Sequence, residues 1–300
     1  MKKKTYLIAL MAMALTLGSC SDNENGIGGE TSKYITVSTS IGNMTRVATD
    51  ANGGQTFEEG DEISVYAWTG APTVAPETSE RVVNNAINKL TNGSWISTPQ
   101  MLWKNNREKH YFIGVYPTAA ISDLSAGEYT FDANKQTESD LLVAVNPDGL
   151  SYSADAQQTV PLTFTHVMAK LAVNLTYKNQ WGGIPTVEKV VVGNAAKEAT
   201  INYLTKVVTP STTAKEDFSL PEITENTKYV SVIIPQEEVT QLTIVIGGKN
   251  FVYDNGTPFK LESGKITTVN LEVGRDEIKL GDVKITDWED GSTFGGEALN

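Results

Sequence analysis

The sequence predicts an all-β protein, on three observations. Apolar and polar residues alternate with a period of two in short segments, turn-forming residues separate these segments, and no segment has convincing helical periodicity. In the first such segment, KYITVSTSIG, Ile35 and Val37 alternate with Thr36 and Ser38. The further segments are rich in β-branched and aromatic residues: DEISVYAW, HYFIGVYP, DLLVAVN, VEKVVVGN, KYVSVIIP, QLTIVIGG and KITTVNLEVG.

Turn signals lie between the segments. Asparagine, aspartate and glycine tolerate the positive φ angles that tight turns require. Such residues occur at Asn92-Gly93, Pro147-Asp148-Gly149, Gly182-Gly183, Gly247-Gly248 and Asp254-Asn255-Gly256. The best helical candidate, Glu80 to Leu90 (ERVVNNAINKL), contains three asparagines and fits a strand with a turn equally well.

The expected number of strands predicts two domains. Roughly a dozen strands exceed the usual seven of a single small sandwich. The run from Lys178 to Pro185 (KNQWGGIP) interrupts the strand pattern with two glycines and a proline. We therefore expect two β-sandwich domains in series, covering residues 33–180 and 181–300. A single elongated sandwich with a long insertion is the alternative.

The first residues have the layout of an export signal. Three lysines precede an apolar run from Tyr6 to Leu17, which is too short to span a bilayer. Leu17-Gly18-Ser19-Cys20 is similar to a bacterial lipobox, in which the cysteine is lipidated and becomes the first mature residue. We predict a lipoprotein signal peptide at residues 1–19 and an anchor at Cys20, whose acyl chains would bind a membrane at ~0.8 kcal/mol per buried CH₂. A chance cysteine in an ordinary signal peptide is the alternative.

Residues 20–32 are predicted to form a lipidated, flexible tether. The stretch from Ser21 to Ser32 is polar, glycine-rich and nearly free of apolar residues. Its early acids, Asp22 and Glu24, resemble the acidic stretch that sends some lipoproteins of gut and oral anaerobes to the outside of the outer membrane. We therefore expect a surface-exposed lipoprotein of the outer membrane.

The composition excludes several classes of function. Cys20 is the single cysteine, so the mature chain offers no disulfide, no thiol nucleophile and no zinc–thiolate site. Loss of the three leader lysines changes the formal net charge from −12 to −12 − 3 = −15. A surface this acidic disfavours nucleic acid and anionic lipid as partners.

No catalytic motif is present, so we expect no enzymatic activity, no cofactor and no metal site. The two histidines, His110 and His166, lie in strand-like segments and fit structural roles better than a catalytic triad or a metal site. Thr49 to Gly54 (TDANGG) lacks the closing acid of a calcium loop. Acidic residues crowd one expected turn and fit a solvated surface better than a catalytic pair: Glu58, Glu59, Asp61 and Glu62.

A set of motifs in a fixed order resembles a known family. After the lipobox come a first strand ending in Met44-Thr45-Arg46, the pattern F-x-x-G-D-x-I-x-V-Y at Phe57 to Tyr66, and PLTFTHVMAKLAVNL at Pro161 to Leu175. SVIIPQ, GKITTVNL and DVKITDWEDG follow. This combination, over essentially the whole chain, resembles the fimbrillin (FimA-like) family of Bacteroides-type anaerobes, the subunits of type V pili. The resemblance implies two transthyretin-like β-sandwiches without enzymatic activity.

The resemblance also implies how the protein matures. Family members reach the cell surface as lipidated precursors, and an arginine-specific protease cuts after an arginine in the loop behind the first strand. Arg46 matches that position, with Val47 as the new N-terminus. The polar run VATDANGGQT that follows Arg46 is of the kind that proteases enter. The alternative is that Arg46 is an ordinary surface arginine.

In the family, the C-terminal segment of a neighbouring subunit fills the groove that the lost first strand leaves. The resemblance thus implies removal of the strand at residues 33–46 and a donor strand at 281–300, with Val283, Ile285 and Trp288 as apolar contacts. Val283 and Ile285 alternate with polar residues, as expected of an added strand. The tail beyond Trp288 is short and polar, however, so the segment could instead complete its own sheet, as in a tip or accessory subunit.

Two functions remain open at this stage. The first is a structural subunit of an adhesive cell-surface pilus, with other pilin subunits, an arginine-specific surface protease and an adhesion ligand on host or bacterial cells as partners. The second is a surface lipoprotein that binds a glycan or another ligand and never polymerises. The five tryptophans could form its binding platform, but packing of Trp68, Trp95 and Trp103 on sandwich faces is the interpretation that we favour.

Overall fold

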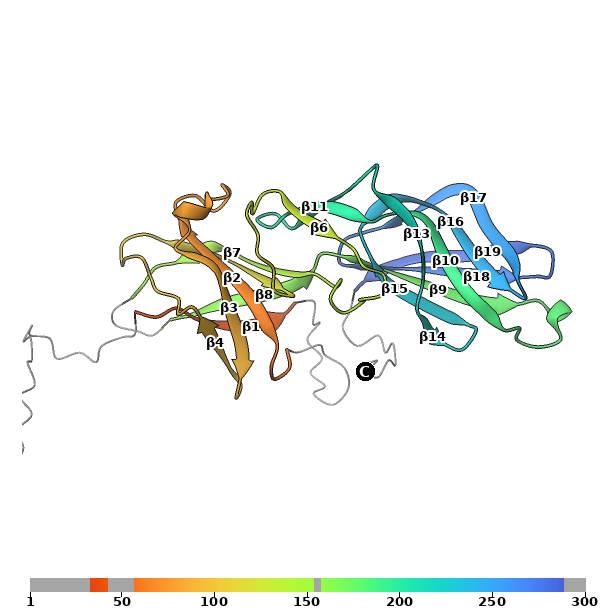
Figure 1. The fold of residues 1–300 in the computed structure, drawn as a ribbon, viewed down its shortest axis with the longest axis horizontal. Coiled ribbons are helices and arrows are strands. Elements are labelled where there is room, and N and C mark those ends of the chain that lie inside the picture. Colours follow the sequence, from red (N-terminus) through yellow and green to blue (C-terminus); the bar gives the residue numbers. More distant parts are fainter. Residues whose placement is uncertain (1–32, 43–56, 154–157, 289–300) are drawn as a thin grey trace, which may run out of the picture. The chain divides into compact units, whose positions relative to one another are not determined.

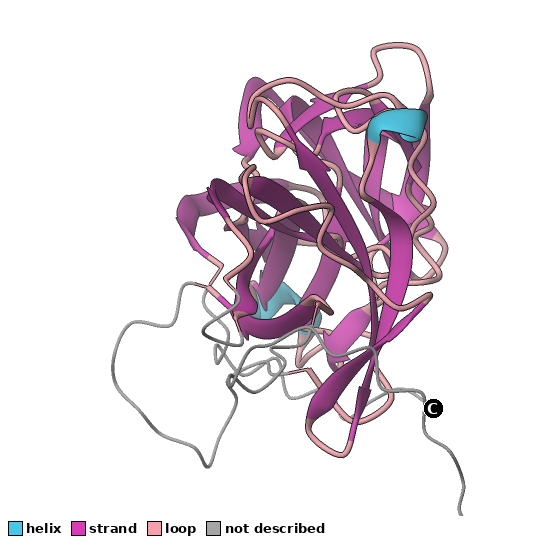
Figure 2. Cartoon of the chain, turned by 90° about the vertical axis from the view of Figure 1, so that its left-hand side faces the viewer, coloured by secondary structure: helices cyan, strands magenta, loops and turns pink. Residues whose placement is uncertain are grey.

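The computed structural model describes residues 33–42, 57–153 and 158–288 (Figure 1). This part of the chain consists of strands, connecting loops and two short 3-10 helices, Thr78–Glu80 and Asn179–Trp181 (Figure 2). The prediction of an all-β fold is therefore confirmed.

Several predicted features lie outside the described residues: the signal peptide (1–19), the tether (20–32) with Cys20, Arg46, Val47, the sequence TDANGG and the tail after Trp288. Within the described ranges, no helix is long and apolar enough to cross a membrane.

A seven-stranded sheet contains the first strand of the described chain. Its strand order is β1-β8-β7-β5-β2-β3-β4, which places β1 and β4 at the two edges. β1 pairs with β8 in parallel, and the other neighbours pair antiparallel. The bounds are β1 Thr36–Ile41, β2 Glu62–Thr69, β3 Val83–Thr91, β4 Ser94–Thr98, β5 His110–Tyr116, β7 Leu142–Leu150 and β8 Thr159–His166.

Three further sheets follow the orders β12-β11-β6, β13-β10-β16-β17 and β14-β15-β9-β18-β19. β9 and β18 pair in parallel, and the other pairs are antiparallel. The bounds are β6 Gly127–Thr130, β9 Ala169–Tyr177, β10 Val187–Ala196, β11 Glu198–Asn202, β12 Val207–Pro210, β13 Lys215–Ser219, β14 Glu222–Thr224, β15 Lys228–Ile233, β16 Gln236–Ile246, β17 Lys249–Leu261, β18 Lys265–Val273 and β19 Ile278–Asp287.

The segments with period-two alternation form the expected strands. The eight segments named above become β1, β2, β5, β7, β10, β15, β16 and β18. The ambiguous segment from Glu80 to Leu90 is largely the strand β3. Asn92 and Gly93 join β3 to β4 with φ angles of 50° and 72°, as expected of a two-residue hairpin turn.

Two of the predicted turns are wrong. Pro147-Asp148-Gly149 lies inside β7, and Asp254-Asn255-Gly256 lies inside β17. In both places the register with the neighbouring strand shifts, between His110 and Phe112 of β5 and between Val239 and Gln241 of β16. Glycine and asparagine accommodate a bulge as readily as a turn, so residue type alone does not separate the two.

Buried apolar side chains form two clusters. One includes Val65 and Phe112 of the seven-stranded sheet together with Ile35 beside β1. The other contains side chains of β9, β10, β16 and β18 and extends to Tyr66 and Ile113. Successive residues of β2 and β5 thus enter different clusters, because successive side chains of a strand point to opposite faces.

The chain passes from the seven-stranded sheet to the five-stranded sheet at Val167 and Met168, which join β8 to β9 and are fully buried. This change lies before the predicted boundary after residue 180. β9 and β10 flank the segment from Lys178 to Pro185, and both contribute to one hydrophobic cluster. The segment therefore does not separate two cores, and the division into two sandwich domains stays a prediction.

His110 is fully buried at the start of β5 and is held as a neutral imidazole. Its Nε2 atom accepts a hydrogen bond from the backbone N–H of Lys104 at 3.0 Å, and its Nδ1 atom lies 3.2 Å from the carbonyl oxygen of Glu108. Burial lowers the pKa of His110 below its ordinary value, although the Glu108 carbonyl opposes this shift.

We predict that His110 makes the protein less stable in mild acid. The folded state disfavours the imidazolium, so the unfolded state binds more protons once the pH falls below the unfolded histidine pKa of about 6.5. Urea unfolding should give a lower free energy of unfolding at pH 5.0 than at pH 7.5, and His110→Gln should reduce that difference. An equal pH dependence in the variant would contradict this assignment.

Candidate functional site

The first strand, β1, is the candidate site, because the proposed maturation acts on it. β1 lies at an edge of the seven-stranded sheet, where its residues from Thr36 to Ile41 pair in register with Thr159 to Phe164 of β8. Hydroxyl groups reinforce this ladder, because Thr36 contacts Thr159 and Ser40 contacts Thr163, each at 3.2 Å between side-chain oxygens.

Alternate side chains of this segment enter the core. Ile35 is 1% exposed and Val37 is 6% exposed, whereas Ile41 is partly buried. This segment therefore covers apolar core through Ile35 and Val37. Each such side chain contributes ~1.5–3 kcal/mol when it is fully buried.

The second side of β1 faces β4, the opposite edge of the same sheet. Backbone hydrogen bonds on this side join the residues just before β1 to the segment that follows β4. The backbone N–H of Ile35 donates to the carbonyl of Met101 at 3.0 Å, and the N–H of Trp103 donates to the carbonyl of Lys33 at 3.2 Å. We call the remaining gap between β1 and β4 the seam.

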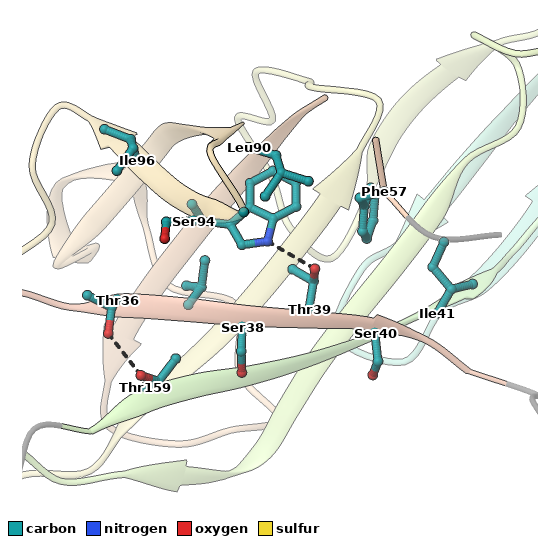
Figure 3. A pocket seen from close by; sticks show the side chains of 13 residues that line it. Thr36, Ser38, Thr39, Ser40, Ile41, Phe57, Leu90, Ser94, Ile96 and Thr159 are labelled. Carbon is teal, nitrogen blue, oxygen red and sulfur yellow. Dashed lines mark hydrogen bonds between the residues drawn. The ribbon is translucent and has the colours of Figure 1, made fainter. Parts of the chain in front are cut away.

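A cavity of ≈ 730 Å³ lies in the seam between residues of β1, residues of β4, Phe57 and Leu90 (Figure 3). The indole Nε1 of Trp95 spans it and donates a hydrogen bond to the hydroxyl of Thr39 at 3.0 Å. Thr39 points toward Trp95, whereas Ser38 and Ser40, which also line the cavity, point to the opposite side of β1. Phe57 closes the seam by edge contacts to Trp95 and Phe164, at centroid distances of 5.3 and 5.1 Å.

β1 and β4 lie close together at their nearest point, where Cα atoms of the two strands approach within 8 Å. A strand inserted there would require about 9.6 Å, which is two strand spacings of ~4.8 Å. No further strand therefore fits between them at that point while β1 is present.

The phenol of Tyr116 is the ionisable group beside the Phe57 ring, with the two ring centroids 5.4 Å apart. Burial, and secondarily the Asp61 carboxylate, raise the pKa of Tyr116 above its ordinary value. Tyr116 therefore stays neutral beside the ring of Phe57.

The candidate donor residues lie at the other end of the chain. β19 pairs with β18 from Ile278 to Asp287 and forms an edge of the five-stranded sheet. Val283 and Ile285 remain 36% and 39% exposed. Trp288 is 2% exposed and packs inside its own chain. The first part of the candidate donor thus completes its own sheet, which is the alternative that the short polar tail suggested.

The structure does not bring the other candidate residues from the sequence together as a reaction centre. His110 and His166 lie at the ends of different strands, β5 and β8. The acidic turn makes local bonds: Asp61 accepts from the N–H of Glu58 at 2.7 Å, and Glu59 accepts from the N–H of Asn92 at 2.7 Å. Among the described residues, no group of histidine, cysteine and carboxylate side chains is arranged to hold a metal ion.

All five tryptophans make internal contacts. Trp68 is 2% exposed, and its Nε1 donates to the carbonyl of Ala71 at 2.9 Å. Trp103 packs edge-on against His110 and Phe112, at centroid distances of 5.0 and 5.7 Å. Trp181 donates to the carbonyl of Val273 at 2.9 Å. These contacts agree with packing on the sandwich faces rather than with a platform for glycan rings.

Sequence reasoning missed the roles of Phe57 and Trp95 in the seam. The sequence indicates Phe57 only as part of a motif and Trp95 only as one of several aromatic packing residues. The available signal was their setting: an aromatic residue directly after a polar loop, and another beside the Asn92-Gly93 turn. Neither position reveals the seam, because the seam joins strands that are far apart in the sequence.

Comparison with known proteins gives a consistent fold. A candidate cell adhesion protein from Bacteroides uniformis is similar at 18% identity and a TM-score of 0.63, covering 86% of this chain and 100% of its own. A second one, from Bacteroides ovatus, has 18% identity, a TM-score of 0.62 and coverages of 85% and 98%. A fimbrial protein from Bacteroides vulgatus has 13% identity, a TM-score of 0.53 and coverages of 86% and 100%.

A search of curated protein sequences gives no match. The family model described as fimbrillin-like, by contrast, matches residues 45–288, which is most of the chain. The protein therefore belongs to the fimbrillin-like family.

Proposed function

We propose that this protein is a non-enzymatic structural subunit of an adhesive cell-surface pilus. It is exported as an outer-membrane lipoprotein anchored at Cys20, cut after Arg46 by an arginine-specific surface protease, and then polymerised with other subunits by strand exchange. Membership of the fimbrillin-like family supports a pilus-type role on the cell surface. The observation that carries the finer proposal is the way in which β1 is held.

β1 has the properties of a strand that can be removed. It has one ladder, with β8, and on its other side the described contacts are two backbone hydrogen bonds at its start, the Tyr34–Leu102 bridge and the bond from Trp95 to Thr39. A cut after Arg46 would leave it without a covalent link to the rest of the sheet. Its loss would empty the core positions of Ile35 and Val37 and unpair the edge of β8.

Such an edge accepts another strand. Val160, Leu162 and Phe164 of β8 are at most 1% exposed while β1 is present. Without β1, these apolar side chains border an open groove beside unpaired backbone groups, which together form a template for β-augmentation. A contact between the groove of one subunit and the end of the next is heterologous, so it generates an open filament.

The segment from residue 281 to 300 is our candidate for the incoming strand. Val283 and Ile285 present partly exposed apolar side chains on an edge strand. To be donated in full, this segment must first leave β18 of its own subunit. The alternative function, a ligand-binding lipoprotein that does not polymerise, loses its proposed platform because the tryptophans are used in packing.

The first prediction concerns cleavage. Arg46→Lys keeps the positive charge but removes the arginine that the protease requires, so this variant should remain a lipidated precursor. N-terminal sequencing of sheared surface material should give Val47 for the natural protein, and filaments should be absent for the variant in electron micrographs. Arg107→Lys is the matched control and should form filaments. Recovery of the natural protein only as a chain starting at lipidated Cys20 would refute the pilus proposal.

The second prediction concerns the bond across the seam. Trp95→Phe keeps an aromatic ring but removes the hydrogen bond to Thr39, at a cost of about 1 kcal/mol. Hydrogen exchange of β1 amides should accelerate about fivefold, since β1 loses a contact on its weakly held side. Trp103→Phe is the control, because the bond of Trp103 to Lys33 comes from the backbone. Equal exchange of β1 in the natural protein and in Trp95→Phe would show that the indole does not retain the strand.

The third prediction concerns the donor. A synthetic peptide of residues 281–300 should bind the chain after cleavage and release of β1, but not the uncleaved chain, in which β1 occupies the groove. Ordering a free strand offsets much of the burial of Val283 and Ile285, so binding should be weak. A peptide with Ile285→Asp should not bind, because it would place a carboxylate in an apolar groove.

Fluorescence anisotropy with a labelled peptide measures this binding, and a peptide of scrambled sequence is the control. Equal binding to cleaved and uncleaved protein would mean that the peptide does not enter the groove of β1.

A further inference from the structure

Trp288, at the end of β19, is held by a clamp of two side chains. Its indole stacks on the imidazole of His166, with 4.0 Å between ring centroids and an interplanar angle of 7°, and the Lys170 Nζ atom lies 3.9 Å from an indole ring centroid. His166 is in turn oriented by Asp140, whose Oδ1 accepts from Nδ1 at 2.8 Å. The backbone N–H of Trp288 donates to the carbonyl of Gly264 at 3.0 Å. We call this arrangement the indole clamp.

The strand β8 connects the indole clamp to the first strand. Thr159 to Phe164 carries the ladder with β1, and His166 follows Phe164 after one residue. The chain just after β1 also contacts this end, because the N–H of Gly42 donates to the carbonyl of Phe164 at 2.7 Å. The same short strand therefore supports β1 and positions the ring that covers Trp288.

β8 depends strongly on β1 for its own pairing. On its other side, β7 pairs only with the last three residues of β8, where Leu142, Val143 and Ala144 face His166, Thr165 and Phe164. In the part of the chain that the structure describes, Thr159 to Thr163 has no strand neighbour other than β1. Loss of β1 thus leaves most of β8 unpaired and leaves His166 on a strand held at one end.

We propose that β8 couples the first strand to the indole clamp, so that loss of β1 releases Trp288 and loosens β19. The purpose of this coupling rests on the proposed function. The coupling would keep the candidate donor strand in its own sheet until the groove of the same subunit has opened. His166 acts as a positioning residue in this device. Because coupling between two sites is a difference of free energies, opening the clamp must weaken the hold on β1 by the same factor.

The forward test detaches β1 without cleavage, in the chain that starts at residue 20. Val37→Asp places a charge in the core beneath β1, whereas Ser38→Asp adds the same charge on the exposed face as a matched control. Hydrogen exchange with mass spectrometry should show about tenfold faster exchange in β1, in β8 and in β19 for Val37→Asp. The sheet β13-β10-β16-β17 should keep its exchange rates, which reports that the variant is folded. Ser38→Asp should leave β19 unchanged.

The reverse test opens the clamp at its other end. Trp288→Ala should raise exchange in β1 and β8 by a factor similar to that by which Val37→Asp raises exchange in β19. Trp181→Ala is the control, because it removes an indole that donates a hydrogen bond to Val273 of β18 in the five-stranded sheet and lies away from β8. This arm decides the question even where Val37→Asp fails to fold.

Unchanged exchange of β1 and β8 in Trp288→Ala would overturn the proposal, as would faster exchange of β8 with an unchanged β19 in folded Val37→Asp. Neither arm uses a protease or a filament. The coupling can therefore fail while cleavage after Arg46 and polymerisation hold, and it can hold in a subunit that is never cleaved.

Discussion

The parallel ladder between β1 and β8 is the interaction on which the rest of the proposed mechanism depends. It joins residues more than a hundred positions apart, from the pair Thr36 and Thr159 to the pair Ile41 and Phe164. Among the described residues, it is the one ladder between β1 and another strand. It also supplies the pairing of Thr159 to Thr163 of β8. One ladder therefore stabilises two segments at once, and its loss frees both.

In the proposed mechanism, this strand has to be retained in the precursor and lost afterwards. Retention comes from two buried side chains, Ile35 and Val37, which together contribute ~3–6 kcal/mol, a large share of the 5–15 kcal/mol that stabilises a typical domain. While the chain is continuous these contacts are intramolecular. After a cut, the released strand gains translational freedom, and the same contacts no longer suffice to hold it indefinitely. Cleavage of one peptide bond would thus lower the fraction of subunits that hold β1, although the contacts of the bound strand stay the same.

The sequence predicts the strands well and their arrangement poorly, for a physical reason. Alternation is a local property, so β1, β2 and β18 could be recognised from their own residues, and burial of Ile35 and Val37 followed from it. Sheet membership is not local. The run PLTFTHVMAKLAVNL reads as one continuous strand, but Val167 and Met168 divide it between two sheets. The seam and the indole clamp depend on such long-range pairings, so Trp95 and His166 could not be placed beforehand.

The two chain ends face the same physical problem, since an edge strand offers unpaired backbone groups to any other strand. β19 carries charged side chains along that edge, among them Lys279, Asp282 and Lys284, which disfavour unspecific pairing. Val283 lies between Asp282 and Lys284, Ile285 follows Lys284, and both apolar side chains remain partly exposed. These exposed apolar side chains would fit best into a groove that is apolar and open. β8 would border such a groove only after β1 has left. In the proposed mechanism, charge on the candidate donor and occupancy of the acceptor groove therefore act in the same direction, and both would oppose assembly before the first strand is removed.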